Sequence, residues 1–227
     1  MKIHVVSATR KTEAEFWQSS ALGRSLQRVA FDQRLAPQVS YANSAGLPQV
    51  YNAAIDRAGA EDVLVFVHDD VWLDDFFFGQ RIHEGTRAFG VIGVAGNTRR
   101  SPGQPAWAFK SRGPSGFEWD QGHLSGVVGH GQNPNGALSV FGFTPAPCVL
   151  LDGVLLAALK QALDAQAVRF DEQFMFHFYD LDFCRTARKN QLRLGTWPIS
   201  LTHQSPGLFN SDAWREKYQR YLEKWKF

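Results

Sequence analysis

The sequence has few cysteines and little excess of charge of either sign. Its 227 residues include only two cysteines, Cys148 and Cys184, and neither lies in a CxxC pair. Two isolated cysteines indicate neither a disulfide framework nor a zinc site. The formal net charge of +2 gives no electrostatic basis for binding nucleic acid or an anionic membrane. We therefore expect no nucleic-acid partner.

Long apolar runs are also absent. No stretch of about 18 apolar residues predicts a transmembrane segment, and Met1 leads directly into a strand-like run without the features of a signal peptide. We expect a soluble, cytoplasmic protein, peripheral to the inner face of a membrane at most. The oligomeric state is left open, because the aromatic face of the last predicted helix packs either on the body or on a partner.

The length and composition are those of an ordinary globular protein. Apolar residues make up 44% and charged residues 20% of the chain, and a chain of this size buries about 70% of its unfolded surface. Over residues 1–96, apolar runs alternate with helical patterns in the order strand, helix, strand, helix, strand, helix, strand. This order predicts an α/β fold with a mostly parallel central sheet flanked by helices.

Local signals place further elements along the chain. Thr12 and Glu15 form a capping box, and apolar residues at helical spacing extend the helix that it opens to about Ala30. Strands are predicted at 2–7, 39–42, 63–67, 91–95, 148–151 and within 193–203, and helices at 48–59, 74–88, 153–165, from Tyr179 and at 211–226. The Gly- and Pro-rich segment 97–147 has no periodic pattern, but its aromatic residues argue against disorder. We expect short strands and an ordered loop lining a cleft there.

The central feature of the sequence is an apolar run, predicted to form a buried strand, that is followed directly by polar and charged residues. Residues 63–67 are all apolar, and the run stops at His68, Asp69 and Asp70. Open α/β sheets bind ligands at the carboxyl edge of their strands. Carboxylate oxygens at such an edge suit a divalent cation, and the cation suits a phosphate. The alternative is that the two carboxylates only end a strand or cap a helix.

Two more polar clusters follow apolar runs, at 179–182 and 203–205. Asp180 and Asp182 lie two residues apart, so on a helix they point to different faces. One of them can face the cleft while the other caps the helix or pairs with a nearby cation. The structural alternative for this pair is a helix N-terminus favoured by the dipole, and for His203 it is a satisfied structural histidine.

Taken in order, four segments resemble GT-A glycosyltransferases, and within them the inverting family 2 type with its StrF-like branch. Residues 3–10 resemble the strand at which the nucleotide binds, and residues 43–55 resemble the turn and helix that flank it. Residues 66–70 stand where the family has its Asp-x-Asp metal motif. Residues 152–195 resemble the acceptor-side segment with its Glu-Asp catalytic pair, and His203 matches a downstream histidine that coordinates the metal.

The resemblance implies the domain organisation and the substrates. It implies one GT-A, Rossmann-like α/β domain over 1–227, with a nucleotide-binding half at 1–96 and an acceptor-side half at 97–227 that contains the long loop 97–147. The implied activity is that of a nucleotide-sugar-dependent, hexosyltransferase-like enzyme. Its donor would be a nucleoside-diphosphate sugar, its acceptor a saccharide or other hydroxyl compound, and its cofactor Mn²⁺ or Mg²⁺.

Individual residues take their roles from their places in these motifs. His68 replaces the first metal-motif aspartate and Tyr179 replaces the catalytic glutamate, so Asp180 is the candidate base. A softer ligand at His68 favours Mn²⁺ over Mg²⁺. The nucleotide-binding candidates are Ser7, Thr9, Arg10, Asn43, Asn52, His68, Asp69 and Asp70; the metal candidates are Asp70 and His203; and the acceptor-side candidates are Asp152, Gly153, Tyr179, Asp182 and Trp107.

The chemistry of such a site is coherent. A cation held by Asp70 and His203 would stabilise the charge left on the departing diphosphate, and a carboxylate takes the proton of a poorly nucleophilic hydroxyl. Arg10, or Arg99 and Arg100, are candidates for contacting the diphosphate, with an ordinary solvated surface as the alternative. Trp107 or Trp119 is a candidate platform for a sugar ring.

Two other interpretations stay open. A metal-dependent phosphohydrolase would use the same carboxylates and histidines to activate water, although no other histidine falls in a closely spaced ligand pair. A catalytically degenerate sugar-nucleotide-binding module is the second alternative, because the first motif aspartate and the catalytic glutamate are both missing.

Overall fold

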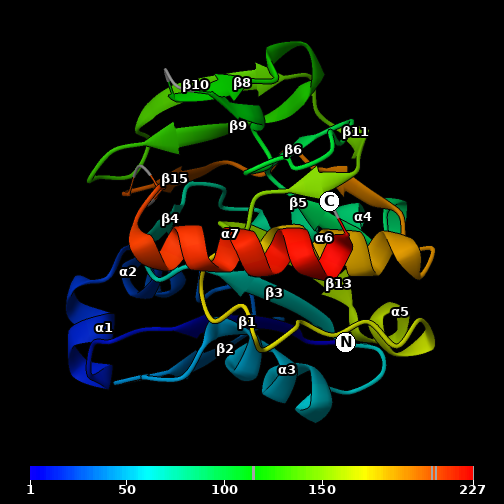
Figure 1. Cartoon of the computed structure of the whole chain (residues 1–227). Helices are drawn as coiled ribbons and strands as arrows, with labels where there is room; N and C mark the ends of the chain where they lie inside the picture. The colour runs from blue at the N-terminus through cyan, green and yellow to red at the C-terminus, as the bar shows by residue number, and fades with distance from the viewer. Residues whose placement is uncertain (114–115, 206, 208, 227) are drawn as a thin grey trace.

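The apolar run that ends at His68 forms strand β3 (Val63–Val67), as predicted, and all five of its residues are buried. The computed structural model describes residues 1–113, 116–205, 207 and 209–226. In this part of the chain β3 belongs to a seven-stranded sheet with the order β11 (Ala146–Cys148), β14 (Leu194–Thr196), β5 (Val91–Gly93), β13 (Leu155–Leu159), β3, β1 (Ile3–Ala8) and β2 (Leu35–Ser40). Figure 1 shows β1, β2 and β3 in its lower half.

This sheet is mixed, which corrects the expected mostly parallel sheet. Strand β1 is parallel to β2 and β3, and β5 is parallel to β14. Strand β13 is antiparallel to both β3 and β5, and β11 is antiparallel to β14. The leucines and alanines of 155–159 favour a helix, so the sequence predicts a helix over 153–165. In the structure these residues form a buried strand between the apolar strands β3 and β5. Packing against these two neighbours outweighs their intrinsic helix propensity.

A second sheet, also mixed, lies beside the first, with β9 and β10 in the upper half of Figure 1. Its order is β12 (Leu150–Leu151), β6 (Ala95–Asn97), β9 (Leu124–His130), β15 (Leu201–His203) and β4 (Val71–Leu73), and β10 (Ala137–Gly142) pairs with β9. A hairpin of β7 (Phe109–Gly113) and β8 (Gly116–Trp119) and a 3₁₀ turn, η1 (Gln121–His123), precede β9. The segment 97–147 therefore contains the short strands that its composition led us to expect.

Helices cover the sheets: α1 (Glu13–Ser19), α2 (Ala21–Arg28), α3 (Leu47–Arg57), α4 (Phe78–Ala88), α5 (Lys160–Ala165), α6 (Tyr179–Lys189) and α7 (Asp212–Trp225). The predicted capping box is present, since Thr12 N donates to Glu15 Oε2 at 2.8 Å and Glu15 N donates to Thr12 Oγ1 at 3.4 Å. The first helix does not continue to Ala30. Ser20 adopts an extended conformation that ends α1, and its hydroxyl caps α2 by accepting from Gly23 N at 2.9 Å.

The chain crosses repeatedly from one sheet to the other. The strand predicted at 91–95 is two strands, β5 and β6, which belong to different sheets, and the strand predicted at 148–151 divides in the same way into β11 and β12. Residues 68–70 lead from β3 to β4, residues 152–154 lead back from β12 to β13, and residues 197–200 lead from β14 to β15. Polar residues that follow buried strands are therefore gathered where the two sheets adjoin.

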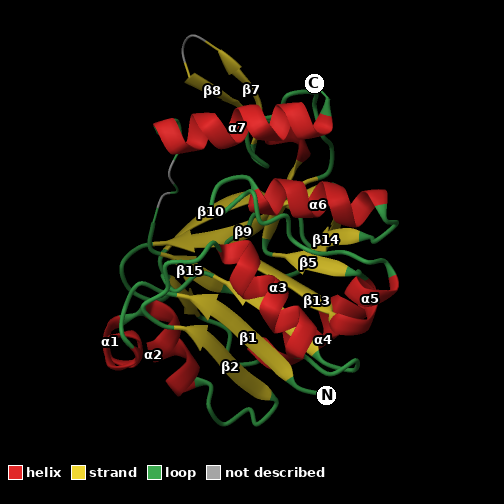
Figure 2. Ribbon diagram, turned by 60° about the horizontal axis from the view of Figure 1, so that its bottom comes forward, coloured by secondary structure: helices red, strands yellow, loops and turns green. Residues whose placement is uncertain are grey.

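The C-terminal helix α7 packs on the body of the molecule through its aromatic face, where Trp214 and Tyr221 are buried. Figure 2 shows α7 beside α6. The two helices are joined by Asp182, a fully buried carboxylate that pairs with Lys224 Nζ at 2.7 Å and accepts from Trp225 Nε1 at 2.8 Å. In the ranges that the structure describes, no helix is both long and apolar enough to cross a bilayer.

We expect Lys224→Met to lower the free energy of unfolding by about 3 kcal/mol, because it leaves a buried carboxylate without its cation. Urea denaturation followed by circular dichroism measures the change. Arg220→Met on the same helix is the matched control. It breaks an exposed pair with Glu216, and its effect should stay below about 1 kcal/mol. Equal effects of the two substitutions would show that the α6–α7 ion pair contributes little.

Candidate functional site

A cavity of about 760 Å³ lies where the two sheets adjoin, and this volume is typical of sites for small ligands. Ten of the residues proposed from the sequence line it: His68, Asp69, Asp70, Trp107, Trp119, Asp152, Gly153, Tyr179, Asp180 and His203. Residues near positions 70, 180 and 203 therefore share one hollow, although they are far apart in the chain.

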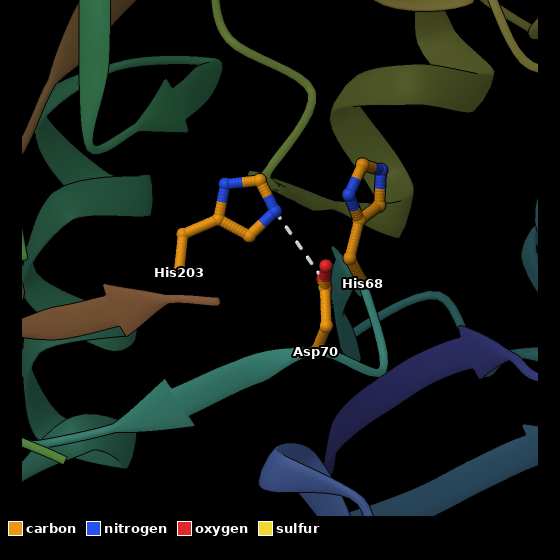
Figure 3. A group of neighbouring side chains, drawn as sticks. All are labelled: His68, Asp70 and His203. Carbon is orange, nitrogen blue, oxygen red and sulfur yellow. Dashed lines mark ion pairs between the residues drawn. The ribbon is translucent and has the colours of Figure 1, made fainter. Parts of the chain in front are cut away.

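Strand pairing brings His203 to Asp70. Strands β15 and β4 are antiparallel with His203 opposite Val71, and Gln204 N donates to the Asp70 carbonyl oxygen at 3.0 Å. His203 Nε2 then lies 3.3 Å from Asp70 Oδ1. His68 enters from the connection after β3, and one ligand atom from each of the three side chains lies within 4.8 Å of the other two (Figure 3). We call His68, Asp70 and His203 the ligand cluster.

The charges of the ligand cluster depend on one another. Burial alone would raise the pKa of Asp70, but the ion pair with His203 outweighs it and lowers that pKa to about 2. Burial would lower the pKa of His203, and the Asp70 carboxylate instead raises it. Burial lowers the pKa of His68, which favours the neutral imidazole. At neutral pH the cluster therefore presents an ionised carboxylate and a neutral His68, the forms that bind metal ions.

The donor set of the ligand cluster fits a divalent cation. It offers one carboxylate oxygen and two imidazole nitrogens, a combination suited to transition-metal ions such as Mn²⁺. Asp70 Oδ1 is buried, and apart from its ion pair with His203 it has no hydrogen-bond donor within the described ranges. Of the described residues that line the cavity, none is a lysine or an arginine, whereas four are aspartates. A cation is therefore the natural partner for this surplus of negative charge.

The first of these aspartates, Asp69, is held from behind by the N-terminal part of the chain. Thr9 Oγ1 donates to Asp69 Oδ2 at 2.5 Å, and Leu22 N donates to the Asp69 carbonyl oxygen at 3.1 Å. Thr9 is buried and does not line the cavity. Its observed contact is thus with a cavity-lining carboxylate rather than with the cavity itself.

Asp180 lies at the start of α6 and accepts hydrogen bonds from Gly153 N at 3.1 Å and from Leu181 N at 2.9 Å. Burial, and after it the negative charge of Asp152, raise the pKa of Asp180 to about 7 and outweigh these hydrogen bonds. A carboxyl group with this pKa exchanges its proton readily at neutral pH. That property suits a general acid or base.

Tyr179 connects the ligand cluster to Asp180. Its hydroxyl donates to the Gly153 carbonyl oxygen at 2.8 Å and lies 2.9 Å from His68 Nε2. Glycine is required at position 153, because a Cβ there would overlap the Tyr179 hydroxyl. Phe178, just before the helix, has a φ of +67° and packs against the ring of Trp214. A left-handed conformation at such a residue costs about 1–2 kcal/mol, and strain of this kind concentrates at functional sites.

Six of the proposed residues do not line the cavity: Ser7, Thr9, Arg10, Asn43, Asn52 and Asp182. Ser7 is fully buried in β1. The Asn43 side chain donates to Ala45 O at 2.8 Å and so closes its own turn. Asn52 exchanges two hydrogen bonds with the backbone of Phe170, at 2.9 and 3.0 Å, and joins α3 to that segment. Hydrogen bonds to backbone groups hold both amide side chains outside the cavity.

The arginines considered for the diphosphate lie outside the cavity too. Neither Arg10 nor Arg99 nor Arg100 is among the described lining residues. Arg99 is held by the buried Asp120 in a two-point ion pair, with Nη2 2.5 Å from Oδ1 and Nε 3.0 Å from Oδ2. Its guanidinium therefore stabilises the segment before the hairpin.

The structure adds residues that were not assigned from the sequence. His130, opposite His203 in the β9–β15 register, lines the cavity. So do His177, Phe109, Phe141, Phe176, Phe209 and Trp214. Phe109 and Phe141 belong to the segment 97–147, which we expected to line a cleft, so their place in the cavity could have been predicted from the sequence. Nothing in the local sequence around Phe209 or Trp214 indicates their place.

Comparison with known protein families identifies the class of this chain. The model of a family described as "Glycosyltransferase like family" matches residues 32–223. The chain therefore belongs to this glycosyltransferase family, which agrees with the resemblance found in the sequence. The narrower StrF-like branch stays a prediction. A search of curated proteins found no match.

Solved glycosyltransferases share the fold at low sequence identity. The catalytic domain of Drosophila β1,4-galactosyltransferase 7 is 11% identical with a TM-score of 0.51, and the match covers 96% of this chain and 79% of that one. S. aureus TarS is 15% identical (TM-score 0.52, 98% and 39% covered) and GalNAc-T7 is 10% identical (0.52, 98% and 48%). The chain spans less than half the length of the last two proteins. These similarities assign the GT-A fold.

We expect Asp152→Asn to lower the pKa of Asp180 below its value of about 7, because the substitution removes a neighbouring negative charge. Carbon-13 NMR titration of the aspartate carboxyl carbons measures the pKa, with Asp180→Asn assigning the signal. Asp56→Asn, on the exposed face of α3 and outside the cavity, should leave the pKa unchanged. An unaltered Asp180 titration in Asp152→Asn would remove Asp152 as a cause.

Proposed function

We propose that this protein transfers a sugar from a nucleoside-diphosphate sugar to a hydroxyl group of an acceptor, with inversion at the anomeric carbon. One arrangement supports this most directly. His68 Nε2 contacts the Tyr179 hydroxyl at 2.9 Å, that hydroxyl donates to Gly153 O at 2.8 Å, and Gly153 N donates to Asp180 at 3.1 Å. A place for a leaving diphosphate and a base for an acceptor thus face one cavity.

Asp180 is the proposed general base. A carboxylate oxygen of Asp180 accepts the proton of the acceptor hydroxyl while that oxygen attacks the anomeric carbon from the side opposite the diphosphate. The new bond to the acceptor oxygen forms as the bond to the phosphate oxygen breaks. A single displacement needs one base and no covalent intermediate, so the product has the inverted configuration.

The departing diphosphate needs positive charge, and the described lining residues supply neither lysine nor arginine. Asp70 and His203, with His68, would hold a divalent cation, which when bound supplies the charge that stabilises the leaving group. Two imidazole nitrogens in the set favour Mn²⁺ over Mg²⁺. The Asp70 carboxylate raises the pKa of His203, so a cation bound there would take the place of the proton on the His203 imidazole, because only the neutral ring binds a metal.

Two proteins with this fold bind ligands of the proposed kinds. GalNAc-T7 was crystallised with UDP, GalNAc and Mn²⁺, and the Drosophila enzyme with xylobiose. We therefore propose a nucleotide-sugar donor, with a hexose as the transferred sugar, and a saccharide or other hydroxyl acceptor. The division into a nucleotide-binding half at 1–96 and an acceptor-side half at 97–227 stays a prediction, as does the cytoplasmic location.

We expect Asp180→Asn to lower turnover at least about 100-fold, because an amide cannot take the acceptor proton. Release of nucleoside diphosphate from a panel of UDP-, GDP- and dTDP-sugars with Mn²⁺ measures turnover, and calorimetry measures nucleotide affinity, which should not change. In the unmodified protein, turnover should rise with pH through about 7, where Asp180 loses its proton.

Asp56→Asn is the control for this substitution, since Asp56 is exposed on α3 and does not line the cavity. It should leave both turnover and nucleotide affinity unchanged. Loss of nucleotide binding in Asp180→Asn, with turnover per bound nucleotide preserved, would assign Asp180 to the donor rather than to the acceptor.

A second prediction concerns the cation. UDP, GDP or dTDP should raise the melting temperature of the protein in the presence of Mn²⁺ and much less without it, because binding to the folded state stabilises it. Asp70→Ala should abolish the difference between the two conditions. Thermal denaturation followed by fluorescence measures the shift, and Asp56→Ala is the matched control.

Equal stabilisation by the diphosphates with and without Mn²⁺ would contradict a metal-assisted mechanism. Metal-linked nucleotide binding without transfer or donor hydrolysis would favour a catalytically degenerate binding module. Stabilisation by the metal alone, together with phosphatase activity, would favour a phosphohydrolase.

A further inference from the structure

The cavity has a second part whose chemistry differs from that of the acidic part. We call it the aromatic end, and it is formed by six lining side chains: Trp107, Phe109, Trp119, Phe141, Phe209 and Trp214. They come from the segment before β7, the β7–β8 hairpin, strand β10, the stretch before α7, and α7 itself. None of these elements carries the proposed donor or base residues, so the aromatic end is separate in the chain from the ligand cluster.

Ring contacts make the aromatic end continuous. The ring centroids of Trp107 and Phe141 lie 5.0 Å apart, those of Phe141 and Trp119 lie 6.3 Å apart, and those of Trp119 and Phe109 lie 4.8 Å apart. Phe109 and Phe209 continue the series at 5.5 Å, and the ring of Phe117 joins Phe209, at 5.8 Å, to Trp214, at 5.5 Å. Edge-to-face and stacked contacts at these distances are the favoured arrangements of aromatic rings. The aromatic end is therefore a packed wall whose members support one another.

This wall leaves apolar area uncovered. Trp119 is 48% exposed and Phe209 is 43% exposed, although both belong to the packed series. Exposed aromatic surface that gathers in a cavity beside a polar centre is typical of a binding site, because a ligand that covers it removes apolar area from water. The ligand part that binds here must itself offer apolar surface.

The polar groups of the cavity point to the same conclusion. Within the described chain, the lining residues include no asparagine, glutamine, lysine, arginine or glutamate, and outside the ligand cluster and Tyr179 their uncharged polar side chains are Ser139, Ser205, His130 and His177. The carboxylates among them are Asp69, Asp70, Asp152 and Asp180, all of which belong to the acidic part. A saccharide chain along the aromatic wall would therefore find few side-chain partners for its hydroxyl groups there, which is costly for those that leave water. The four carboxylates also disfavour an anionic acceptor.

The two parts of the cavity are joined at the reacting position. Trp214 packs against Phe178 at 5.1 Å, and Phe178 immediately precedes Tyr179 and Asp180. On the other side, the ring of Phe176 stacks on that of His68 at 6.0 Å. A molecule that lies on the aromatic wall can thus present a hydroxyl group to Asp180 without leaving the cavity.

We propose that the acceptor is an uncharged amphipathic alcohol: a hydroxyl group, carried directly or on one sugar ring, joined to an aromatic or alkyl body that binds the aromatic end. This inference rests on the proposed glycosyl transfer and narrows its acceptor. The apolar body covers Trp119 and Phe141 while the hydroxyl group reaches Asp180. Free oligosaccharides and anionic acceptors fit this lining less well.

Binding of three neutral probes tests the proposal without any turnover. Octyl β-glucoside below its critical micelle concentration, nitrophenyl β-glucoside and methyl β-glucoside share one sugar and differ in the body attached to it. Calorimetric titration of the full chain should give an affinity at least about tenfold higher for one or both of the first two. A preference for the octyl compound identifies an alkyl body, and a preference for the nitrophenyl compound identifies an aromatic one.

Variants locate the binding. Trp119→Ala should lower the affinity for the preferred probe about tenfold, and Trp119→Phe should restore most of it. Phe143→Ala is the matched control, since Phe143 follows β10, is 96% exposed and does not line the cavity. If Trp119→Ala does not fold, the comparison of the three probes on the unmodified chain still tests whether the cavity prefers a glucoside with an apolar body. Equal affinities for all three glucosides, or a loss in Phe143→Ala equal to that in Trp119→Ala, would overturn the proposal.

The proposed acceptor and the proposed glycosyl transfer can be tested independently of each other. Glucoside affinity is read without donor or metal, whereas the metal-linked stabilisation by nucleoside diphosphates is read without acceptor. If the glucosides bind equally but nucleoside diphosphates stabilise the protein only with Mn²⁺, the glycosyltransferase proposal stands and the acceptor is of another kind. If the apolar glucosides bind more tightly but the diphosphates give no metal-linked stabilisation, the cavity binds amphiphiles and the proposed transfer reaction is wrong.

Discussion

The antiparallel pairing of β4 with β15 is the constraint on which the candidate site depends. It sets His203 opposite Val71 and therefore beside Asp70. Strand β3, which delivers His68, belongs to the other sheet, so the ligand cluster exists only because the two sheets adjoin. Backbone hydrogen bonds hold strands in one register, and a shift of one residue would turn the imidazole of His203 to the opposite face.

The acidic part of the cavity shows how one fold assigns different roles to similar side chains. Asp70 has an imidazolium partner, which lowers its pKa to about 2, and Asp180 has burial and a second carboxylate, which raise its pKa to about 7. Two carboxyl groups of one cavity are thereby separated into a permanent anion and a titrating group. The negative charge of Asp152 repels that of the ionised Asp180. The buried strands β3 and β13 stabilise the fold that keeps the two carboxyl groups close together.

Several elements could be predicted because local chemistry determines them. The capping box at Thr12, the fully apolar strand at 63–67 and the start of α6 at Tyr179 agree with the structure, since each depends on neighbours within a few residues. The strand at 155–159 could not be predicted in this way. Its residues favour a helix, and only the two flanking strands, which are distant in sequence, make it extended.

For the candidate site, the sequence by itself determined which groups are available: the carboxylates and histidine that end a buried strand, the Tyr179-Asp180 pair that opens a helix, and a histidine downstream. Only the tertiary structure decided which of them meet. It brought Asp70, Asp180 and His203 to one cavity and buried Asp182 against Lys224. It also assembled the aromatic end from segments that share no local pattern. The physical reason is that side-chain type and helix periodicity act over a few residues, whereas a cavity is formed by sheet register and packing between distant segments.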